Sequence, residues 1–319
     1  MISDIEKNKI DLYKLKNEND LQNVENAFNL FLKKNITKKK YFSKIRKCAC
    51  GSKKFTNSFD IGFFKYIRCQ CETYFVSPMP KDNFLDIIYS NKGPYSLYRK
   101  KFLENKKKKR IRSGVINRRK IDQISLILKD KKKLILDFGC GDGGFLKLCK
   151  KHGYKNLYGV DTKYKNILQK DGITFSDSLK NFKLVKKFDC IVLWGVLEHL
   201  NNPVEFSKNI FKYLKKGGHV FLEAPNSNSL LMNFLSMFNI KVNRFIEPGR
   251  HLYFFSQKFF HIYSKKLKFK LIDLETNGLD LQTLIGPTND KLTKKILMVQ
   301  NSIDRLNFSD HFRAVFQKK

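Results

Sequence analysis

The sequence predicts an α/β fold, in which a mostly parallel sheet is covered by helices on both faces, plus a small cysteine-containing module near the amino terminus. From Lys133 onward, short apolar strands alternate with helical segments, which is the pattern of such a sheet. A glycine-rich turn, Gly139 to Gly144, follows the first of these strands. Four of the seven cysteines form two close pairs ahead of this region.

The spacing of apolar residues and the cysteine positions predict four segments along the chain. They are a helical lead-in over residues 1–45, a cysteine module over 46–80, a lysine-rich helical linker over 81–130 and the α/β domain over 131–319.

Within the α/β domain, apolar runs bounded by turn residues predict the strands. These are Leu134–Phe138, Leu157–Asp161, Ile173–Ser176, Cys190–Trp194, His219–Ala224, Lys270–Leu274 and Phe312–Phe316. Helices are predicted over Gly143–His152 and Pro203–Leu214, and we expect Gly217 and Gly218 to end the second helix.

Composition indicates a globular protein, since 42% of its 319 residues are hydrophobic and 13% are aromatic. The longest apolar run, Leu230–Phe238, is far shorter than the ~20 residues that span a bilayer. The start, MISDIEKNK, contains acids where a signal peptide has a basic segment. These features predict a cytoplasmic protein without a membrane span.

The formal net charge is +35, and it arises mainly from lysines spread along the whole chain. The densest run, Lys106–Arg112, has no interleaved aromatic residues on which bases could stack, which favours a solvated face. A nucleic-acid partner is therefore disfavoured without being excluded, and the charge favours an anionic substrate.

The glycine turn alone does not identify its ligand, because GxGxxG at Gly139, Gly141 and Gly144 shows only that backbone approaches a ligand closely. Asp137 precedes the turn and Asp142 lies inside it. Carboxylates disfavour the pyrophosphate of a nicotinamide cofactor at a helix amino terminus. S-adenosylmethionine, with its ammonium and sulfonium groups, suits them better.

The ordered set LILDFGCGDGG, YGVD, FDCIVLWGVLEHLNNP and LKKGGHVFLEAPN resembles the class I S-adenosylmethionine-dependent methyltransferases over about Lys133–Lys270. The resemblance implies a Rossmann-like, seven-stranded sheet with the last strand antiparallel. It also implies a cofactor crevice at the carboxyl ends of the strands.

The resemblance assigns roles to individual residues around this crevice. Asp137, Gly139 and Gly141 would face the methionine portion of the cofactor, and Asp161 would bind the ribose. Asp161 could instead cap a helix. The adenine neighbour would be Asp177, for which a turn-forming role is the alternative, and Trp194 either lines the cofactor or packs in the core.

Glu198 and His199 follow the fourth strand, and they resemble a pair found in ubiquinone-type O-methyltransferases. Some of those enzymes have an acid three residues earlier and bind a divalent metal there. This chain has Gly195 at that position, so we expect no catalytic metal. The candidate general bases are His199, oriented by Glu198, and His251, in a loop that resembles the family's substrate-covering loop.

The cysteine pairs, Cys48 with Cys50 and Cys69 with Cys71, could supply four thiolates to a structural zinc. Their context resembles the zinc-ribbon-like module ahead of certain sugar and natural-product methyltransferases. Those modules usually carry CxxC pairs, whereas both pairs here are CxC, so reduced cysteines without metal are the alternative.

Together these features predict methyl transfer, O- or C-linked, to a small and anionic acceptor such as a nucleotide-linked sugar or another surface-glycan or natural-product intermediate. The alternatives are an RNA or protein methyltransferase that uses the lysine-rich surface, and a cofactor-binding scaffold without catalysis.

Overall fold

The computed structural model describes residues 12–16, 18–44, 47–105, 107–108, 116–162, 167–182, 187–238 and 245–319. The first residues of the helical lead-in and most of the basic run Lys106–Arg112 lie outside this part of the chain. Lys108 is described, and its Nζ lies 2.9 Å from Asp20 Oδ2.

One eight-stranded sheet organises the carboxyl-terminal two thirds of the chain, in the order β13-β14-β11-β10-β6-β7-β9-β8. The neighbouring strands from β11 to β9 run parallel, whereas β14 is antiparallel to both β11 and β13. The strands are β6 (Leu134–Phe138), β7 (Asn156–Val160), β8 (Leu168–Lys170), β9 (Ile173–Ser176), β10 (Phe188–Trp194), β11 (Leu214–Pro225), β13 (Phe269–Asn277) and β14 (His311–Lys318).

This sheet confirms the predicted α/β class, and all seven predicted strands are present, Leu134–Phe138 and Ile173–Ser176 with the predicted ends and the other five with shifted ends. Strand β8 is an addition: its three residues are exposed and pair antiparallel with β9 at the edge of the sheet. Because it is short and not apolar, periodicity gives no signal for it.

The predicted role of Gly217 and Gly218 is wrong. Helix α9 (Pro203–Ile210) is followed by a 3-10 turn, η5 (Phe211–Tyr213), and β11 already begins at Leu214. Both glycines lie inside β11, where its pairing with β10 shifts register between Phe188 and Cys190. Gly217 has a φ of 73°, so these glycines accommodate an irregular strand rather than a helix end.

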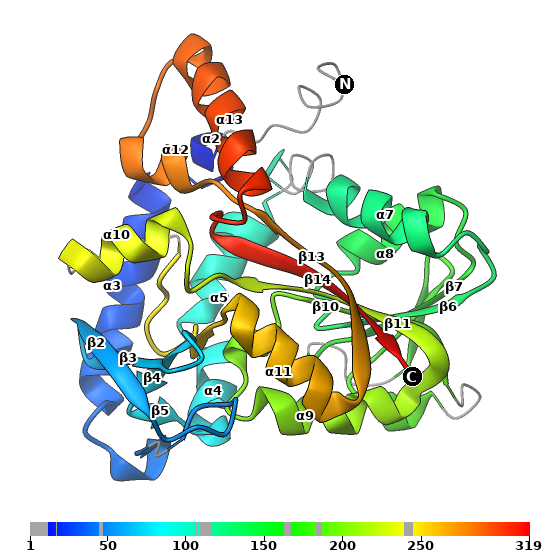
Figure 1. Cartoon of the computed structure of the whole chain (residues 1–319), viewed down its shortest axis with the longest axis horizontal. Helices are drawn as coiled ribbons and strands as arrows, with labels where there is room; N and C mark the ends of the chain where they lie inside the picture. Colours follow the sequence, from blue (N-terminus) through cyan, green and yellow to red (C-terminus); the bar gives the residue numbers. More distant parts are fainter. Residues whose placement is uncertain are drawn as a thin grey trace.

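Helices cover both faces of the sheet (Figure 1). On one face, α7 (Ile116–Ile127) and α8 (Gly144–Lys151) bury Ile121, Ile124 and Leu146 against the strands. On the other face, α9 and α11 (Gln257–Leu267) pack in the larger core, which Phe259, Phe260 and Tyr263 help to fill.

The cysteine module contributes three strands to a smaller sheet, ordered β12-β4-β3-β2. Its strands are β2 (Phe55–Ile61), β3 (Phe64–Cys69), β4 (Tyr74–Ser77) and β12 (Tyr253–Phe254). The last strand comes from the region that follows β11, so one sheet joins segments that are far apart in the sequence.

The remaining amino-terminal elements are α2 (Leu12–Leu15), α3 (Glu18–Asn35), η1 (Lys39–Tyr41), β1 (Phe42–Ser43), β5 (Met79–Pro80), α4 (Asp82–Tyr89), α5 (Tyr95–Tyr98) and η2 (Arg99–Leu103). Of these elements, α2 lies beside α12 (Asp280–Ile285), and α3 and α4 lie next to the small sheet (Figure 1).

Three further helices stand at one end of the molecule (Figure 1). They are α10 (Leu230–Phe238), after β11, and α12 (Asp280–Ile285) and α13 (Asp290–Arg305), between β13 and β14. Within the described residues, no helix combines the length and apolarity that crossing a membrane requires.

Candidate active site

The turn between β6 and α8 places three glycines in the left-handed region, with φ of 77° at Gly139, 55° at Gly141 and 74° at Gly143. A Cβ at Gly143 would lie 2.6 Å from the Phe175 ring, so this position admits no side chain. GxGxxG matching selects Gly144 instead, which is the first residue of α8. The residue that must be glycine is therefore Gly143, one position before the Gly144 that the GxGxxG pattern selects.

Two of the predicted acids hydrogen-bond to the backbone of this turn. Asp161, directly after β7, accepts from the Gly141 amide at 2.9 Å. Asp142 accepts from the Gly144 amide at 3.1 Å, at the start of α8. Asp142 therefore stabilises the backbone of the turn just ahead of α8, in addition to adding negative charge near it.

Asp137 is buried at the carboxyl half of β6, with 3% of its surface exposed. Burial raises its pKa to about 8, an effect that Lys120 opposes and Asp161 increases. A cationic group that approaches this carboxyl would favour its ionised form.

Lys120 of α7 completes a buried charged cluster that the sequence did not indicate. Its Nζ lies 2.9 Å from Glu223 Oε1 and 4.8 Å from the centre of the Trp194 ring. Arg313 donates to Glu223 Oε2 at 2.9 Å. Burial opposes ionisation of Glu223, but Lys120 and Arg313 together hold its pKa well below the usual range.

At this edge of the sheet, Trp194 packs against a neighbouring side chain, whereas Asp177 is exposed. The Trp194 ring packs edge-on against Phe145 at 5.6 Å, and its indole nitrogen is buried with no hydrogen-bond partner among the described residues. Asp177 follows β9, is exposed and accepts from the Asn181 amide at 2.9 Å.

Glu198, His199 and His251 converge beyond the end of β10. One side-chain ligand atom from each lies within 4.8 Å of the others. The Nδ1 of His199 lies 2.9 Å from the Arg250 carbonyl and 3.0 Å from the Tyr89 hydroxyl, and the Nδ1 of His251 lies 2.8 Å from the Phe245 carbonyl. A carbonyl only accepts, so each Nδ1 carries the proton and each Nε2 has a lone pair.

The backbone that carries this cluster is joined to the cysteine module. The Leu252 amide donates to the Glu198 carbonyl at 2.7 Å, and the Val76 amide of β4 donates to the Leu252 carbonyl at 3.0 Å. The buried Tyr66 hydroxyl of β3 donates to the His251 carbonyl at 3.1 Å. The small sheet thus holds the loop on which His251 lies.

The pKa values of the three residues in the cluster are shifted in different directions. Burial raises the pKa of Glu198 to about 8, whereas burial and neighbouring cations lower the pKa of His199 to about 3 and that of His251 to about 4. The Oε1 of Glu198 lies 3.8 Å from His199 Nε2, beyond hydrogen-bond distance. The Glu198 Oε2 is buried and has no hydrogen-bond partner among the described residues.

Arg250 and three tyrosines border this cluster, and sequence patterns did not single them out. The guanidinium carbon lies 4.0 Å from the centre of the Tyr95 ring, 5.1 Å from that of Tyr98 and 5.7 Å from that of Tyr89. Arg250 Nη1 also lies 2.9 Å from Glu247 Oε2. Burial opposes ionisation of Glu247, but Arg250 outweighs it, and the pKa of Glu247 falls to about 2.

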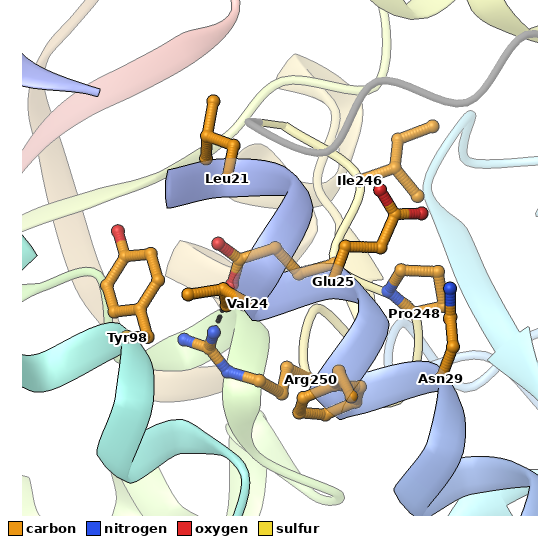
Figure 2. A pocket seen from close by; sticks show the side chains of 10 residues that line it. Leu21, Val24, Glu25, Asn29, Tyr98, Ile246, Pro248 and Arg250 are labelled. Carbon is orange, nitrogen blue, oxygen red and sulfur yellow. Dashed lines mark ion pairs between the residues drawn. The ribbon is translucent and has the colours of Figure 1, made fainter. Parts of the chain in front are cut away.

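Figure 2 shows a pocket that Arg250 lines together with residues of α3, Tyr98 and Pro248. The cavity measures about 50 Å³, enough for one or two waters but not for a sugar nucleotide. The pocket is therefore a packing gap under α3 rather than an acceptor site.

The four cysteines of the module are buried and come together at the ends of two similar turns. The Gly51 amide donates to the Cys48 carbonyl at 2.8 Å, and the Glu72 amide donates to the Cys69 carbonyl at 2.7 Å. All four Sγ atoms lie within 4.8 Å of one another. Hydrogen bonds from Cys48 and Cys71 lower the pKa of Cys50.

The sulfur separations fit a tetrahedral metal better than a disulfide. Cys48 Sγ lies 3.8 Å from Cys71 Sγ, and Cys50 Sγ lies 3.6 Å from Cys69 Sγ. A tetrahedron with Zn–S bonds of ~2.3 Å has S–S edges of about 3.8 Å, while a disulfide bond is ~2.05 Å long.

Comparison with known proteins finds a family and several relatives that are similar to the region of the large sheet. Residues 109–274 match a family described as a methyltransferase domain. A tRNA U34 carboxymethyltransferase from Campylobacter fetus is 24% identical over 204 residues, which are 54% of this chain and 69% of that protein. A mitochondrial ubiquinone biosynthesis O-methyltransferase from Dictyostelium discoideum is 26% identical over 30% of this chain and 36% of that protein.

Among solved structures, an S-adenosylmethionine-dependent methyltransferase from Archaeoglobus fulgidus aligns with a TM-score of 0.45 at 20% identity, over 70% of this chain and 99% of that one. The names of the two sequence relatives differ in what they specify, tRNA in one and ubiquinone biosynthesis in the other.

Proposed function

This chain belongs to the methyltransferase-domain family and is an S-adenosylmethionine-dependent methyltransferase, and we propose that it methylates a small anionic molecule. The observation that carries the proposal is the buried cluster of Glu198, His199 and His251, of which Glu198 is 3% and His251 8% exposed. A small acceptor can approach such buried groups more readily than a base within a folded RNA can.

We propose that the cofactor binds across the carboxyl ends of β6, β7, β9 and β10, as the predicted site residues imply. Asp137 would face the cationic methionine portion, next to the backbone of Gly139 and Gly141. Asp161 would bind the ribose, Asp177 would lie near the adenine, and Trp194 would line the cofactor. The buried carboxyl of Asp137 and the bond from Gly141 to Asp161 support this placement.

Glu198 is the group that we propose as the proton acceptor of the cluster, with His199 and His251 as its neighbours. A general base works best when its pKa lies near the working pH, and Glu198 alone of the three meets this condition. The two histidines stay neutral and offer their Nε2 lone pairs to an acceptor hydroxyl. The expectation of no catalytic metal at this cluster stays a prediction.

Charge supports an anionic acceptor. The chain carries +35, and Arg250, over the Tyr95 ring and paired with Glu247, stands at the border of the cluster. An anion that approaches the cluster is attracted by the overall field of the chain. A nucleotide-linked sugar or another intermediate of surface-glycan or natural-product synthesis has this character.

Two assays test the proposal in sequence. Thermal unfolding should shift upward with S-adenosylhomocysteine and stay unchanged with NAD, because the former brings an ammonium group to Asp137 and the latter a pyrophosphate. Transfer of labelled methyl groups should then occur to a pool of small nucleotide-linked sugars. Label in tRNA or protein, with none in the small-molecule pool, would contradict the small-acceptor proposal.

An RNA acceptor is the second candidate, favoured by the net charge and by relatives whose names specify tRNA. Binding through lysines would show a steep dependence on salt concentration. Retained methyl transfer to small molecules at high salt distinguishes the two candidates.

We also propose a structural zinc bound by Cys48, Cys50, Cys69 and Cys71. The sulfur separations and the two similar turns support it. When bound, the metal would cross-link the two turns and so fix the small sheet that supports His251. The division of the chain into segments that end at residues 45, 80 and 130 also remains a prediction.

A further inference from the structure

The longest apolar run of the sequence, Leu230–Phe238, is not explained by the methyl-transfer site. The structure folds it as α10, which contains no charged residue. One face is buried through Leu231, Met232 and Leu235. The opposite face exposes Leu230, Phe234, Met237 and Phe238, with Met237 74% and Phe238 57% accessible.

Neighbouring segments add to this exposed apolar surface. The Leu230 amide donates to the Phe308 carbonyl at 2.8 Å, and the Leu231 amide donates to Asp280 of α12 at 3.1 Å. The start of α10, α12 and the segment after α13 therefore meet at one place. Ten of the 17 exposed large hydrophobic side chains among the described residues belong to this region, which we call the α10–α13 surface: Leu230, Phe234, Met237, Phe238, Ile285, Leu292, Met298, Val299, Leu306 and Phe308.

Cations accompany the apolar side chains on α13. Its exposed residues include Leu292, Met298 and Val299 together with Lys291, Lys294, Lys295 and Arg305. The only exposed acid in the helix is Asp290, at its first position. A helix face that mixes exposed aliphatic side chains with lysine is typical of segments that lie on anionic lipid.

We propose that the α10–α13 surface docks on an anionic membrane surface, with α10 inserting its apolar side chains between headgroups while the lysines of α13 contact lipid phosphates. Charge complementarity selects this occupant over a second copy of the chain. Self-association through this face would bring like-charged lysines together in a protein that already carries +35.

The position of this surface relates it to the catalytic edge. Helices α12 and α13 lie between the end of β13 and the start of β14, and His311 at that start pairs with Pro225 at the carboxyl end of β11. They therefore leave the sheet at the edge where its parallel strands end (Figure 1). Docking would bring that edge close to the bilayer. The inference does not depend on which acceptor is methylated.

Flotation with lipid vesicles tests the proposal on the full chain. The wild-type protein should float with vesicles of phosphatidylcholine and phosphatidylglycerol at about 0.15 M salt, and much less with phosphatidylcholine alone. Replacement of Phe234 and Met237 by Glu should lower the vesicle-bound to free ratio at least about tenfold, because two inserted apolar side chains are lost.

A matched double variant controls for charge. Leu126→Glu with Ile167→Glu also replaces two exposed apolar residues, 72% and 52% accessible, and changes the net charge equally. It should float like the wild type. Thermal unfolding and the S-adenosylhomocysteine shift should be the same in both variants, which separates this test from that of the methyl-transfer site.

Three results would overturn the proposal. The first is no flotation of the wild type with anionic vesicles. The second is equal binding by both double variants, which would indicate non-specific attraction by scattered lysines. The third is a wild-type dimer that F234E/M237E converts to monomer without a change in flotation, which would assign the face to a second copy.

Discussion

The glycine turn and the Glu198 cluster lie at the same edge of one sheet, yet they are built in opposite ways. The turn is local: Gly139, Gly141 and Gly143 follow one another, and Asp161 comes from the neighbouring strand. The cluster is assembled from separate segments, since His199 contacts Tyr89 of α4 and His251 is held by Tyr66 of β3.

This difference explains where a single sequence is informative. A local turn needs specific residues at fixed spacing, so its pattern is visible in the chain. A cluster assembled from separate segments leaves only isolated residues in the sequence, and its geometry depends on tertiary packing. Substitutions in the glycine turn and in the Glu198 cluster should therefore have different effects on stability, cofactor binding and activity.

The largest effect is expected at the cluster. Glu198→Gln removes the proposed proton acceptor and should lower the rate of methyl transfer about 10²–10⁴-fold with cofactor affinity retained. The rate of the wild type should rise as the pH passes about 8, because the carboxyl then becomes ionised and able to take a proton. Steady-state kinetics across this pH range provide the measurement.

Glu205→Gln, at an exposed acid of α9, is the matched control and should behave as the wild type. The folded protein holds a proton on Glu198 that the unfolded chain releases near pH ~4.3. Stability from this group is therefore lost as the pH rises from there to about 8, and the Gln variant should lose that slope. An unchanged pH–rate profile in Glu198→Gln would refute the base assignment.

Loss of the proposed zinc should have the next largest effect. The purified protein should contain about one zinc per chain, and Cys69→Ser should lose it together with several kcal/mol of folding stability. Activity should also fall, because the Tyr66 hydroxyl holds the His251 loop from the same small sheet. Metal analysis and thermal unfolding provide the measurements.

Cys190→Ser is the control for the loss of a buried thiol alone, since Cys190 is fully buried in β10 and is not one of the four clustered cysteines. It should lose stability but retain zinc. Wild-type protein with less than a tenth of a zinc per chain would show that the four thiols are simply reduced.

At the glycine turn, the strongest effect is expected from Gly143→Ala. Its new methyl group would lie 2.6 Å from the Phe175 ring in a left-handed backbone, which should cost about 1–3 kcal/mol of stability and weaken the cofactor-induced shift. Gly141→Ala has a similar φ but no atom within 4 Å of the new Cβ. If both variants lose the same stability, contact with Phe175 is not the constraint.

The smallest effect separates the two acids of the turn. Asp142→Ala removes the hydrogen bond to the Gly144 amide and should cost about 1 kcal/mol of stability, with little change in the affinity for S-adenosylhomocysteine. Asp137→Asn should instead weaken that affinity, because it removes a buried carboxyl beside the proposed cation site. Calorimetric titration of the two variants distinguishes structure from binding.

The sequence predicted the sheet well, because β6, β9 and their neighbours are apolar runs between turn residues, each with its own local signal. Its local signals misled at two positions: Gly144 fitted the spacing although Gly143 bears the constraint, and Gly217–Gly218 resembled a helix end although they form an irregular part of β11.

Contacts that join distant segments could not be predicted. Lys120 gives no local signal of its ion pair with Glu223, which is formed by α7 packing across the sheet. Arg250 likewise acquires its tyrosine neighbours only when α4 and α5 fold over the site. The roles of these residues depend on tertiary distance rather than on spacing in the chain.

The pairing of β12 with β4 has a consequence for how the protein is made. During synthesis, the cysteine module leaves the ribosome early, but its sheet lacks the fourth strand until Tyr253 and Phe254 emerge. By then all five strands of the parallel part of the main sheet have been synthesised. Closing so long a loop is slow. We therefore expect the module to be completed late, and a nascent chain arrested before residue 253 should be sensitive to protease in the module.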